Sequence, residues 1–239
     1  MSGLRRFFVK ELSVGECDLV GEEFNHAANV LRLKAGEKLL LCNNTGYEYP
    51  AEILSVEKKK MRLMVSDGCP CPNEPKVKIT LCCGYLKGDK TELVVQKATE
   101  LGVTNIIVFD SAFSSAYVSD NKMERLNRVA EESAKQCGRA TYPTVTYLPF
   151  KSALEQAQGY QNKVFACEFE SEKNFSLTEI TGETFIVVGS EGGFSEEERE
   201  YALSCGFQSV SLGNRILRAE TACIALVSVV AYGLGEWKR

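Results

Sequence analysis

The sequence is poor in the residue patterns from which metal sites are built. It has a single histidine, His26, and no two of its ten cysteines are spaced as CxxC. Structural zinc sites draw their ligands from such cysteine and histidine patterns, so we expect no metal site. Several cysteines lie in apolar, strand-like runs such as LLLC and ITLCC. That placement is typical of buried, reduced thiols in a cytosolic protein.

Long apolar runs and an excess of positive charge are also missing. The longest apolar stretch, residues 222–235, is too short to span a bilayer and predicts a buried helix. The opening residues, MSGLRRFFVKEL, carry charge on both sides of a short apolar patch, unlike a secretory signal, and we expect a cytoplasmic protein. The net charge of −4 excludes a globally basic nucleic-acid binder but not a local basic patch.

The hydrophobic pattern changes after residue 72, in a proline-containing run, DGCPCPNEP, that predicts a linker. The strands predicted before it are 6–9, 38–42, 51–56 and 61–65. The strands predicted after it are 77–83, 104–109, 163–167, 184–189 and 209–212, and they alternate with helices near 89–101, 121–137, 152–158, 195–205 and 220–234. We therefore predict a small β module over residues 1–72 and an α/β module with a mainly parallel sheet over residues 73–239.

The most informative stretch is VVGSEGGFSEEER at residues 187–199, where a strand meets a glycine turn and then a helix start. Ser195 and Glu198 have the spacing of a capping box, as do Asp89 and Glu92 at an earlier helix. Glycine turns of this kind usually bind phosphate through backbone N–H groups, but Glu191 and the glutamates behind it would repel a phosphate. The chain has neither a P-loop lysine nor a GxGxxG motif here.

A second glycine loop, SLGNRILRAETA at residues 211–222, follows the last predicted strand. Ligands of open α/β sheets bind at the carboxyl ends of the strands, where we expect both loops to lie. Two such loops favour a nucleoside-like ligand, and acidic surroundings suit one with a sulfonium cation and no phosphate, such as S-adenosylmethionine. The alternative is a tight turn and a capped helix whose acidic residues only favour the helix N-terminus.

Six segments along nearly the whole chain carry a resemblance to a known family: RRFFV, HAANVLRLKAGEKLLL, KGDKTELVVQKATELGV, AEESAKQCGR, VVGSEGGFSEEE and SLGNRILRAETA. On these segments the chain closely resembles the bacterial 16S ribosomal RNA uridine-N3 methyltransferases, a family of the knotted SPOUT superfamily. The resemblance implies S-adenosylmethionine-dependent methylation of N3 of a specific uridine in the small ribosomal subunit. It also implies a PUA-like β-barrel over residues 1–72 that binds RNA, a SPOUT-type α/β domain with a C-terminal deep trefoil knot over residues 73–239, and a homodimer.

Matching the family motifs residue by residue implies cofactor contacts from both loops. These are Gly189, Glu191, Gly192, Gly193, Leu212, Gly213, Ile216, Leu217 and Ala222. The chain departs from the family pattern at two places. Ser190 stands where the family usually has proline, which loosens one turn position but keeps both glycines. The segment DSAFSSAYVSD at residues 110–120 has no arginine where the family often has one, so an RNA contact by that arginine is in doubt.

Methylation at N3 of uracil requires loss of a weakly acidic proton, so a base or a cation that stabilises the uracil anion would accelerate it. Arg218, at the end of the second loop, is the candidate cation, and the alternative is an arginine that braces the loops by pairing with Glu220 or Glu191. Glu191 or Glu220 is the candidate base, and each could equally orient backbone or cap a helix. His26 lies in the first module, and we assign it a structural or RNA-facing role.

Cations that could contact RNA phosphates occur in both modules. They are Arg5, Arg6, Arg32, Lys34, Lys87 and Arg139, with Lys90 and Lys135 as further candidates. Residues 1–72 contain ten Lys and Arg against ten Asp and Glu, so we expect recognition of a structured RNA–protein particle by shape rather than by a broad positive field. Three other functions stay open: a SPOUT methylase acting on another RNA or atom, a non-catalytic RNA-binding ribosome assembly factor, and an enzyme with a phosphate ligand, which the acidic loop disfavours.

Overall fold

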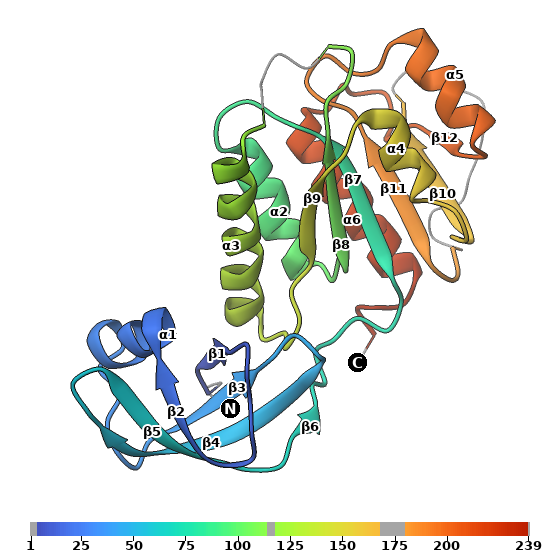
Figure 1. Ribbon diagram of the computed structural model, residues 1–239. Coiled ribbons are helices and arrows are strands. Elements are labelled where there is room, and N and C mark those ends of the chain that lie inside the picture. The colour runs from blue at the N-terminus through green and yellow to red at the C-terminus, as the bar shows by residue number, and fades with distance from the viewer. Residues whose placement is uncertain (1–3, 114–117, 168–179, 239) are drawn as a thin grey trace. The chain divides into compact units, whose positions relative to one another are not determined.

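The computed structural model describes residues 4–113, 118–167 and 180–238 (Figure 1). The chain divides into two compact units. Unit 1 comprises Met1–Glu74 and Ala134–Tyr142, and unit 2 comprises Pro75–Ser133 and Pro143–Arg239. Unit 1 thus contains the last turn of a long helix and the segment after it. The predicted boundary after residue 72 treats each domain as one continuous stretch, and it stays a prediction.

Unit 1 is built on a six-stranded sheet. Its strands follow in the order β1 (Arg6–Phe8), β3 (Lys38–Cys42), β4 (Tyr47–Val56), β5 (Lys60–Val65) and β2 (Gly15–Val20), and β6 (Cys69–Pro70) pairs with β4. β1 and β3 are parallel, and the other pairs are antiparallel. Helix α1 (Gly21–Asn25) and a π-helical turn (His26–Val30) connect β2 to β3. The pairings among described residues do not join β1 to β2, so closure into a barrel stays a prediction.

The two phenylalanines of β1 pack on opposite sides of the strand, because consecutive side chains point to opposite faces. Phe7 is fully buried in the main core of unit 1, where its ring meets the edge of His26 at a centroid distance of 5.8 Å. Phe8 is buried in a smaller cluster, with its ring 4.9 Å from that of Tyr142. Both rings serve packing, which gives His26 a structural contact as well.

Unit 2 contains a fully parallel sheet, as the alternation of strands and helices predicts. Its strands follow in the order β12 (Gln208–Val210), β10 (Asn162–Ala166), β11 (Thr184–Val188), β7 (Ile79–Gly84), β8 (Asn105–Phe109) and β9 (Thr144–Tyr147). Its helices are α2 (Lys90–Glu100), α3 (Asp120–Cys137), α4 (Phe150–Glu155), α5 (Glu196–Ser204) and α6 (Ala219–Gly233). The last turn of α3 belongs to unit 1.

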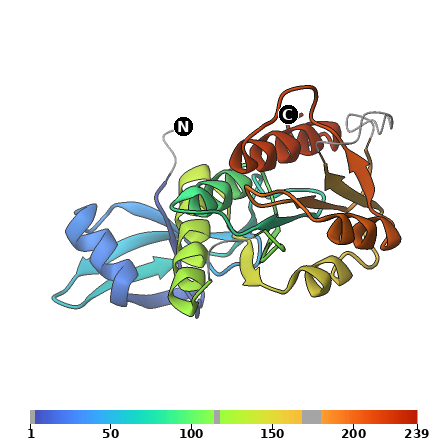
Figure 2. The same cartoon turned by 90° about the horizontal axis from the view of Figure 1, so that it is seen from above.

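Helices cover both faces of this sheet, so its strands β7, β8 and β11 are buried along nearly their whole length rather than at alternate residues (Figures 1 and 2). Ile79 and Leu81 of β7 pack in a core with α2, α3 and α6. Cys82, between β7 residues of that first core, packs in a second core with α4 and α5. Two hydrophobic cores therefore hold the carboxyl ends of the strands in a fixed arrangement.

The two predicted capping boxes have different outcomes. At α5 the Ser195 hydroxyl accepts from the Glu198 N–H at 3.2 Å, and the Glu198 carboxylate accepts from the Ser195 N–H at 2.9 Å, which confirms the prediction. At α2, Asp89 is the N-cap residue but makes no side-chain capping bond. A capping side chain requires extended backbone at the N-cap, and ψ is 162° at Ser195 but 8° at Asp89.

All ten cysteines are free thiols in the structure. Burial raises the pKa of Cys82 well above its usual value. A hydrogen bond with Cys83 and then burial raise the pKa of Cys223 in the same way, so both groups are protonated at neutral pH. Among the described residues, none of the helices has both the length and the hydropathy needed to cross a membrane.

Candidate functional site

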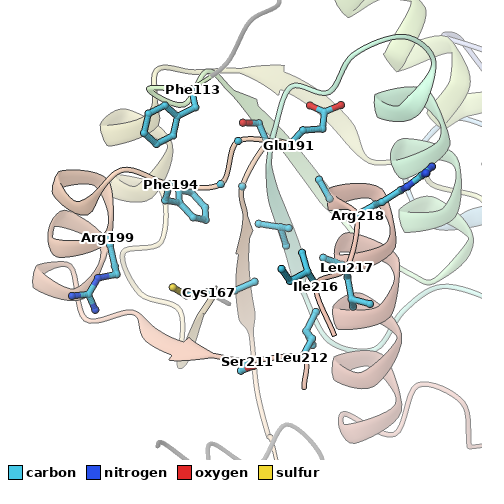
Figure 3. Close-up of a pocket in the computed structure, with 18 of the residues that line it drawn as sticks. Phe113, Cys167, Glu191, Phe194, Arg199, Ser211, Leu212, Ile216, Leu217 and Arg218 are labelled. Carbon is cyan, nitrogen blue, oxygen red and sulfur yellow. The ribbon is translucent and has the colours of Figure 1, made fainter. Parts of the chain in front are cut away.

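A cavity of about 900 Å³ lies in unit 2 at the carboxyl ends of three neighbouring strands, β10, β11 and β12. Its walls include Cys167 just after β10, the loop after β11 and the loop after β12 (Figure 3). Because the three strands are parallel and adjacent, all three connections leave the sheet at the same edge. This is the edge at which open α/β sheets bind their ligands.

The loop after β11, residues 189–195, forms a tight turn, which we call the first loop. The Gly193 N–H donates to the Ser190 carbonyl at 3.0 Å, so Glu191 and Gly192 occupy the centre of a β-turn. Gly193 has φ of +69°, a conformation that glycine adopts without strain. Gly84 at the end of β7 lets the turn approach the sheet, because a Cβ there would lie 2.5 Å from the Ser190 nitrogen.

Glu191 is bound by α2 and the residues before it. Its Oε1 accepts from Lys90 Nζ at 3.0 Å and from the Lys87 N–H at 3.1 Å. Partial burial raises the pKa of Glu191, but the hydrogen bonds from Lys90 and from the Glu191 and Lys87 N–H groups outweigh burial and leave it below its usual range. A carboxylate held in its charged form by a cation is a weak proton acceptor, so this geometry favours the bracing role for Glu191 over the base.

Lys90 also lies 4.0 Å from Oε2 of Glu220 in the first turn of α6. Glu220 is buried, and its Oε2 has no hydrogen-bond partner among the residues that the structure describes. One lysine from α2 thus faces the carboxylates of the first loop and of the start of α6. Lys90 therefore neutralises charge where the first loop and the start of α6 meet α2, a role that its position in the sequence does not indicate.

Ser190, which replaces the proline usual in the family pattern, makes a contact that proline could not make. Its hydroxyl is 2.8 Å from the hydroxyl of Ser111, and both side chains are buried. Ser111 lies in the connection after β8, so the hydrogen bond ties this connection to the first loop. The Ala112 N–H adds a second tie by donating to Glu198 Oε1 at 2.7 Å.

The loop after β12, residues 211–218, is more exposed, and we call it the second loop. Gly213 adopts φ of +95°, and its N–H donates to the Ser211 hydroxyl at 3.3 Å. Ile216 is 83% exposed although it is apolar and lines the cavity. An exposed apolar side chain on the wall of a cavity is available to cover an apolar part of a ligand.

Every residue that the family motif assigns to the cofactor lines this one cavity. They are Gly189, Glu191, Gly192, Gly193, Leu212, Gly213, Ile216, Leu217 and Ala222. Lining residues that sequence reasoning did not single out as site residues include Phe113, Cys167, Phe194, Arg199 and Arg215. Phe194 and Arg199 lie within residues 187–199, the segment that contains the first loop, so their position in the sequence could have marked them as site residues. Phe113 and Cys167 follow other strands and had no such signal.

Arg218, the predicted catalytic cation, lines the cavity and is exposed. Its side chain extends away from Ile216 and Leu217 and from the centre of the cavity (Figure 3). Among the described residues no ion pair joins it to Glu191 or Glu220, which are instead within 4.0 Å of Lys90. The bracing alternative for Arg218 is therefore not the arrangement in this structure.

The predicted RNA-contacting cations fall into two groups. Arg5, Arg32, Lys34 and Lys87 are exposed. Arg6 pairs with Glu48 inside unit 1, and Lys135 pairs with Glu23 at 2.5 Å. Arg139 is only 3% exposed, and burial lowers its pKa while Glu74, 3.7 Å away, opposes that shift. A guanidinium in this position supports the packing of unit 1 and is poorly placed for a phosphate contact.

Comparisons with known proteins agree with the fold and the site. A family model described as "RNA methyltransferase domain" matches residues 72–231, and one described as "RNA methyltransferase PUA domain" matches residues 19–63. Ribosomal RNA small subunit methyltransferase E of Bacillus subtilis is 33% identical, over 90% of this chain and 89% of the relative. The enzyme of the same name from Mesomycoplasma hyopneumoniae is 32% identical, over 93% and 97%.

A solved structure of a relative has the same fold. The ribosomal RNA small subunit methyltransferase E of Neisseria gonorrhoeae, bound to S-adenosyl methionine, superposes with a TM-score of 0.85 at 31% identity, over 95% of this chain and 96% of that one. The α/β methyltransferase fold and a PUA-like domain are thus both present in this chain. The expected family is confirmed: the chain belongs to the RNA methyltransferase family that includes the ribosomal RNA small subunit methyltransferases E.

Proposed function

We propose that this chain transfers a methyl group from S-adenosylmethionine to N3 of a specific uridine in the 16S RNA of the small ribosomal subunit. One observation carries the proposal: both glycine loops of the family motif line a single cavity at the carboxyl ends of β10, β11 and β12. The relatives named as methyltransferases match nearly the whole chain. Fold, family and cavity therefore support the same activity.

The residues of the cavity fit S-adenosylmethionine chemically. The cofactor supplies an electrophilic methyl group on a positively charged sulfur. The carboxylates of Glu191 and Glu196 line the cavity and pair with Lys90 and Arg199 at 3.0 and 2.7 Å, so the wall carries both signs of charge and does not repel a ligand cation. Gly192 leaves no room for a side chain, since a Cβ there would lie 2.5 Å from the Cβ of Phe113, so the ligand meets bare backbone. Leu212, Ile216 and Leu217 offer apolar cover for a flat base, and the two glycine loops offer backbone N–H and C=O groups for specificity.

This chain's own residues would orient uracil and stabilise its anion. N3 becomes a nucleophile only after its proton has left, and the negative charge then spreads onto the neighbouring carbonyl oxygens. Arg218 is the candidate to stabilise that charge, which requires its exposed side chain to turn toward the cavity. Glu191 holds the first loop through Lys90. Glu191 and Glu220 both lie within 4.0 Å of Lys90, and Glu220 does not line the cavity, so the geometry favours neither carboxylate as the proton acceptor.

The remaining parts of the family pattern belong to the same proposal. Residues 1–72 form a PUA-like β-barrel that binds RNA, and residues 73–239 form a SPOUT-type domain with a C-terminal trefoil knot. The protein acts as a homodimer in the cytoplasm. Exposed Arg5, Arg32, Lys34 and Lys87 contact RNA phosphates, and each such contact adds to the salt dependence of binding.

The test combines product analysis with a variant. The protein is incubated with labelled S-adenosylmethionine and small ribosomal subunits that lack native methylation, and the digested RNA is analysed for 3-methyluridine at one position. Arg218→Ala should lower kcat about 100-fold while changing the cofactor Kd less than about twofold, because it removes charge stabilisation from the transition state alone. Another methylated nucleoside would overturn the assignment of N3. Cofactor binding without any transfer to RNA would point to a non-catalytic assembly factor.

A further inference from the structure

The described residues that follow β8 reach the rim of the cavity at Phe113, and three contacts hold them there. The buried hydroxyls of Ser111 and Ser190 are 2.8 Å apart. The Ala112 N–H donates to Glu198 at 2.7 Å. Phe113 itself lies directly on the backbone of the first loop, since a Cβ added to Gly192 would come within 2.5 Å of the Phe113 Cβ. Its position is therefore set by the same turn that lines the cavity.

The ring of Phe113 is unusual among the aromatic residues near the cavity because it stays in solvent. Phe194 packs against the rings of Phe109, Phe150 and Phe165 at centroid distances of 6.2, 5.9 and 4.3 Å. The ring pairs found among the described residues do not include Phe113, which is 56% exposed. Exposing an aromatic ring to water is unfavourable in the free protein. A flat ligand that covers the ring removes this apolar surface from water, which favours binding.

Cations accompany this ring around the same cavity. Arg199, Arg215 and Arg218 all line it (Figure 3). Arg199 lies with Phe113 on the side of the first loop and pairs with Glu196 at 2.7 Å, and Arg218 lies on the side of the second loop with its side chain extending away from the centre of the cavity. A flat aromatic surface beside guanidinium groups is the combination with which proteins bind an unstacked nucleotide, the ring stacking on the base and the cations meeting the phosphates. S-adenosylmethionine carries a single carboxylate, which one of these cations can meet, so cations on both sides of the rim leave others for the phosphates of RNA.

We propose that Phe113 is the platform on which the target uracil stacks when it enters the cavity, and that the Ser111–Ser190 hydrogen bond is the positioning contact that holds this platform. The inference rests on the proposed function and adds a residue that recognises the base. An enzyme that methylates a ring atom must take the base out of its stack, and a protein ring then replaces the lost stacking. Phe113 also lies in the segment in which the family often has an arginine. In this chain a stacking contact would therefore replace the charged contact of that arginine.

The first experiment compares substitutions of Phe113 in the full-length protein acting on unmethylated small subunits. Phe113→Ala should lower kcat/KM for the subunit roughly tenfold or more, because it removes a base-stacking surface. The cofactor Kd, measured by calorimetry, should change less than about twofold. Phe113→Trp should keep kcat/KM within about threefold of wild type, and Phe113→Leu, which keeps bulk without a ring, should behave like Phe113→Ala. Leu203→Ala on α5 is the control, an exposed apolar side chain outside the cavity lining.

The outcomes separate this inference from the proposed function. An active wild type with an unimpaired Phe113→Ala variant would overturn the platform and leave the function intact. A cofactor Kd that rises in step with the loss of kcat/KM would also overturn it, since Phe113 would then be part of the cofactor wall. A wild type that binds the cofactor but methylates no RNA would remove both proposals together.

A second experiment tests the positioning contact. Ser111→Ala removes one partner of the Ser111–Ser190 bond and should lower kcat/KM for the subunit about threefold. The same substitution in a Phe113→Ala background should cost nothing further, because the platform that it positions is gone. A purely structural role would give the same loss in both backgrounds, and that result would contradict the assignment.

Discussion

The two loops of the cavity differ in how firmly the protein holds them. The first loop is tied down by a β-turn hydrogen bond, the Ser111–Ser190 bond, the Lys90–Glu191 ion pair and the capping box at Ser195. The second loop is mostly exposed, and its described internal hydrogen bonds involve Ser211 and Gly213. The first loop therefore forms an ordered wall of the cavity before a ligand binds, whereas the second loop gains packing contacts only when the ligand is bound.

This contrast predicts that substitutions near the two loops should have different effects on stability and on ligand binding. Changes under the first loop should damage the free protein and the site together, because its contacts exist before any ligand arrives. Changes in the second loop should leave the free protein's stability unaltered and appear only in binding. A site with one ordered and one exposed wall keeps specificity in the ordered part and leaves a path for entry through the other.

The largest effect is expected from Gly84→Ala, because Gly84 packs directly under the first loop. The new Cβ would lie 2.5 Å from the Ser190 backbone nitrogen, so the turn must move. Overpacking of this kind costs about 1–3 kcal/mol. If the whole cost appears as weaker cofactor binding, the cofactor Kd rises roughly 5- to 150-fold. Calorimetric titration with S-adenosylmethionine, beside a thermal melt, measures both consequences.

Gly159→Ala is the control for the general cost of replacing a glycine. Gly159 has φ of +88° and open space around it in a turn after α4, outside the cavity lining. It should lower the melting temperature slightly and leave the cofactor Kd unchanged. An unchanged cofactor Kd in Gly84→Ala would mean that the first loop tolerates displacement, and the comparison of the loops would fail.

Ile216→Ser tests the opposite wall. Ile216 is so exposed that the substitution should not change the melting temperature of the free protein by more than about 1 °C. Burial of its side chain by the ligand would be lost, so the cofactor Kd should rise about tenfold. Leu203→Ser, at another exposed apolar position, should change neither quantity. Destabilisation of the free protein by Ile216→Ser would show that the second loop is already packed.

Lys90→Ala removes the cation that faces both Glu191 and Glu220. A half-exposed ion pair contributes at most about 1 kcal/mol, and two carboxylates lose their partner here, so we expect the cofactor Kd to rise about three- to tenfold. Lys97→Ala is closely matched, since both lysines lie on α2, both side chains are 37% exposed and Lys97 pairs with Glu100. Equal effects of the two variants would refute a specific role for Lys90.

The smallest effect concerns pH. The pKa of Glu191 lies below its ordinary value of 4.5, so its charged form contributes stability at all pH values above 4.5, and the contribution disappears as the pH falls through the lowered value. The difference in unfolding free energy between wild type and Glu191→Gln should therefore be constant from about pH 6 to 8 and shrink only in more acidic solution. Chemical denaturation across this range measures it, and a difference that shrinks near neutrality would contradict the lowered pKa.

The elements with strong periodicity were predictable, and those with weak or short signals were not. The five strands predicted in unit 2 occur within a few residues of their expected positions, because buried parallel strands are continuous apolar runs. β2, β6 and β9 were not predicted, since β6 is a pair of residues with a proline and β2 and β9 are largely polar and exposed. The capping box at Ser195 was predictable from the sequence. The one predicted at Asp89 does not form, because the backbone of Asp89 is not extended.

What the sequence determined by itself is the composition of the two loops and the strands that precede them, because glycine turns, caps and apolar runs are local properties of the chain. Which residues face those loops was decided only by the tertiary structure. Ser111 meets Ser190 across 79 residues, and Lys90 meets Glu191 across 101. These contacts depend on the strand order that brings β7, β8, β10, β11 and β12 together, and no local pattern encodes that order.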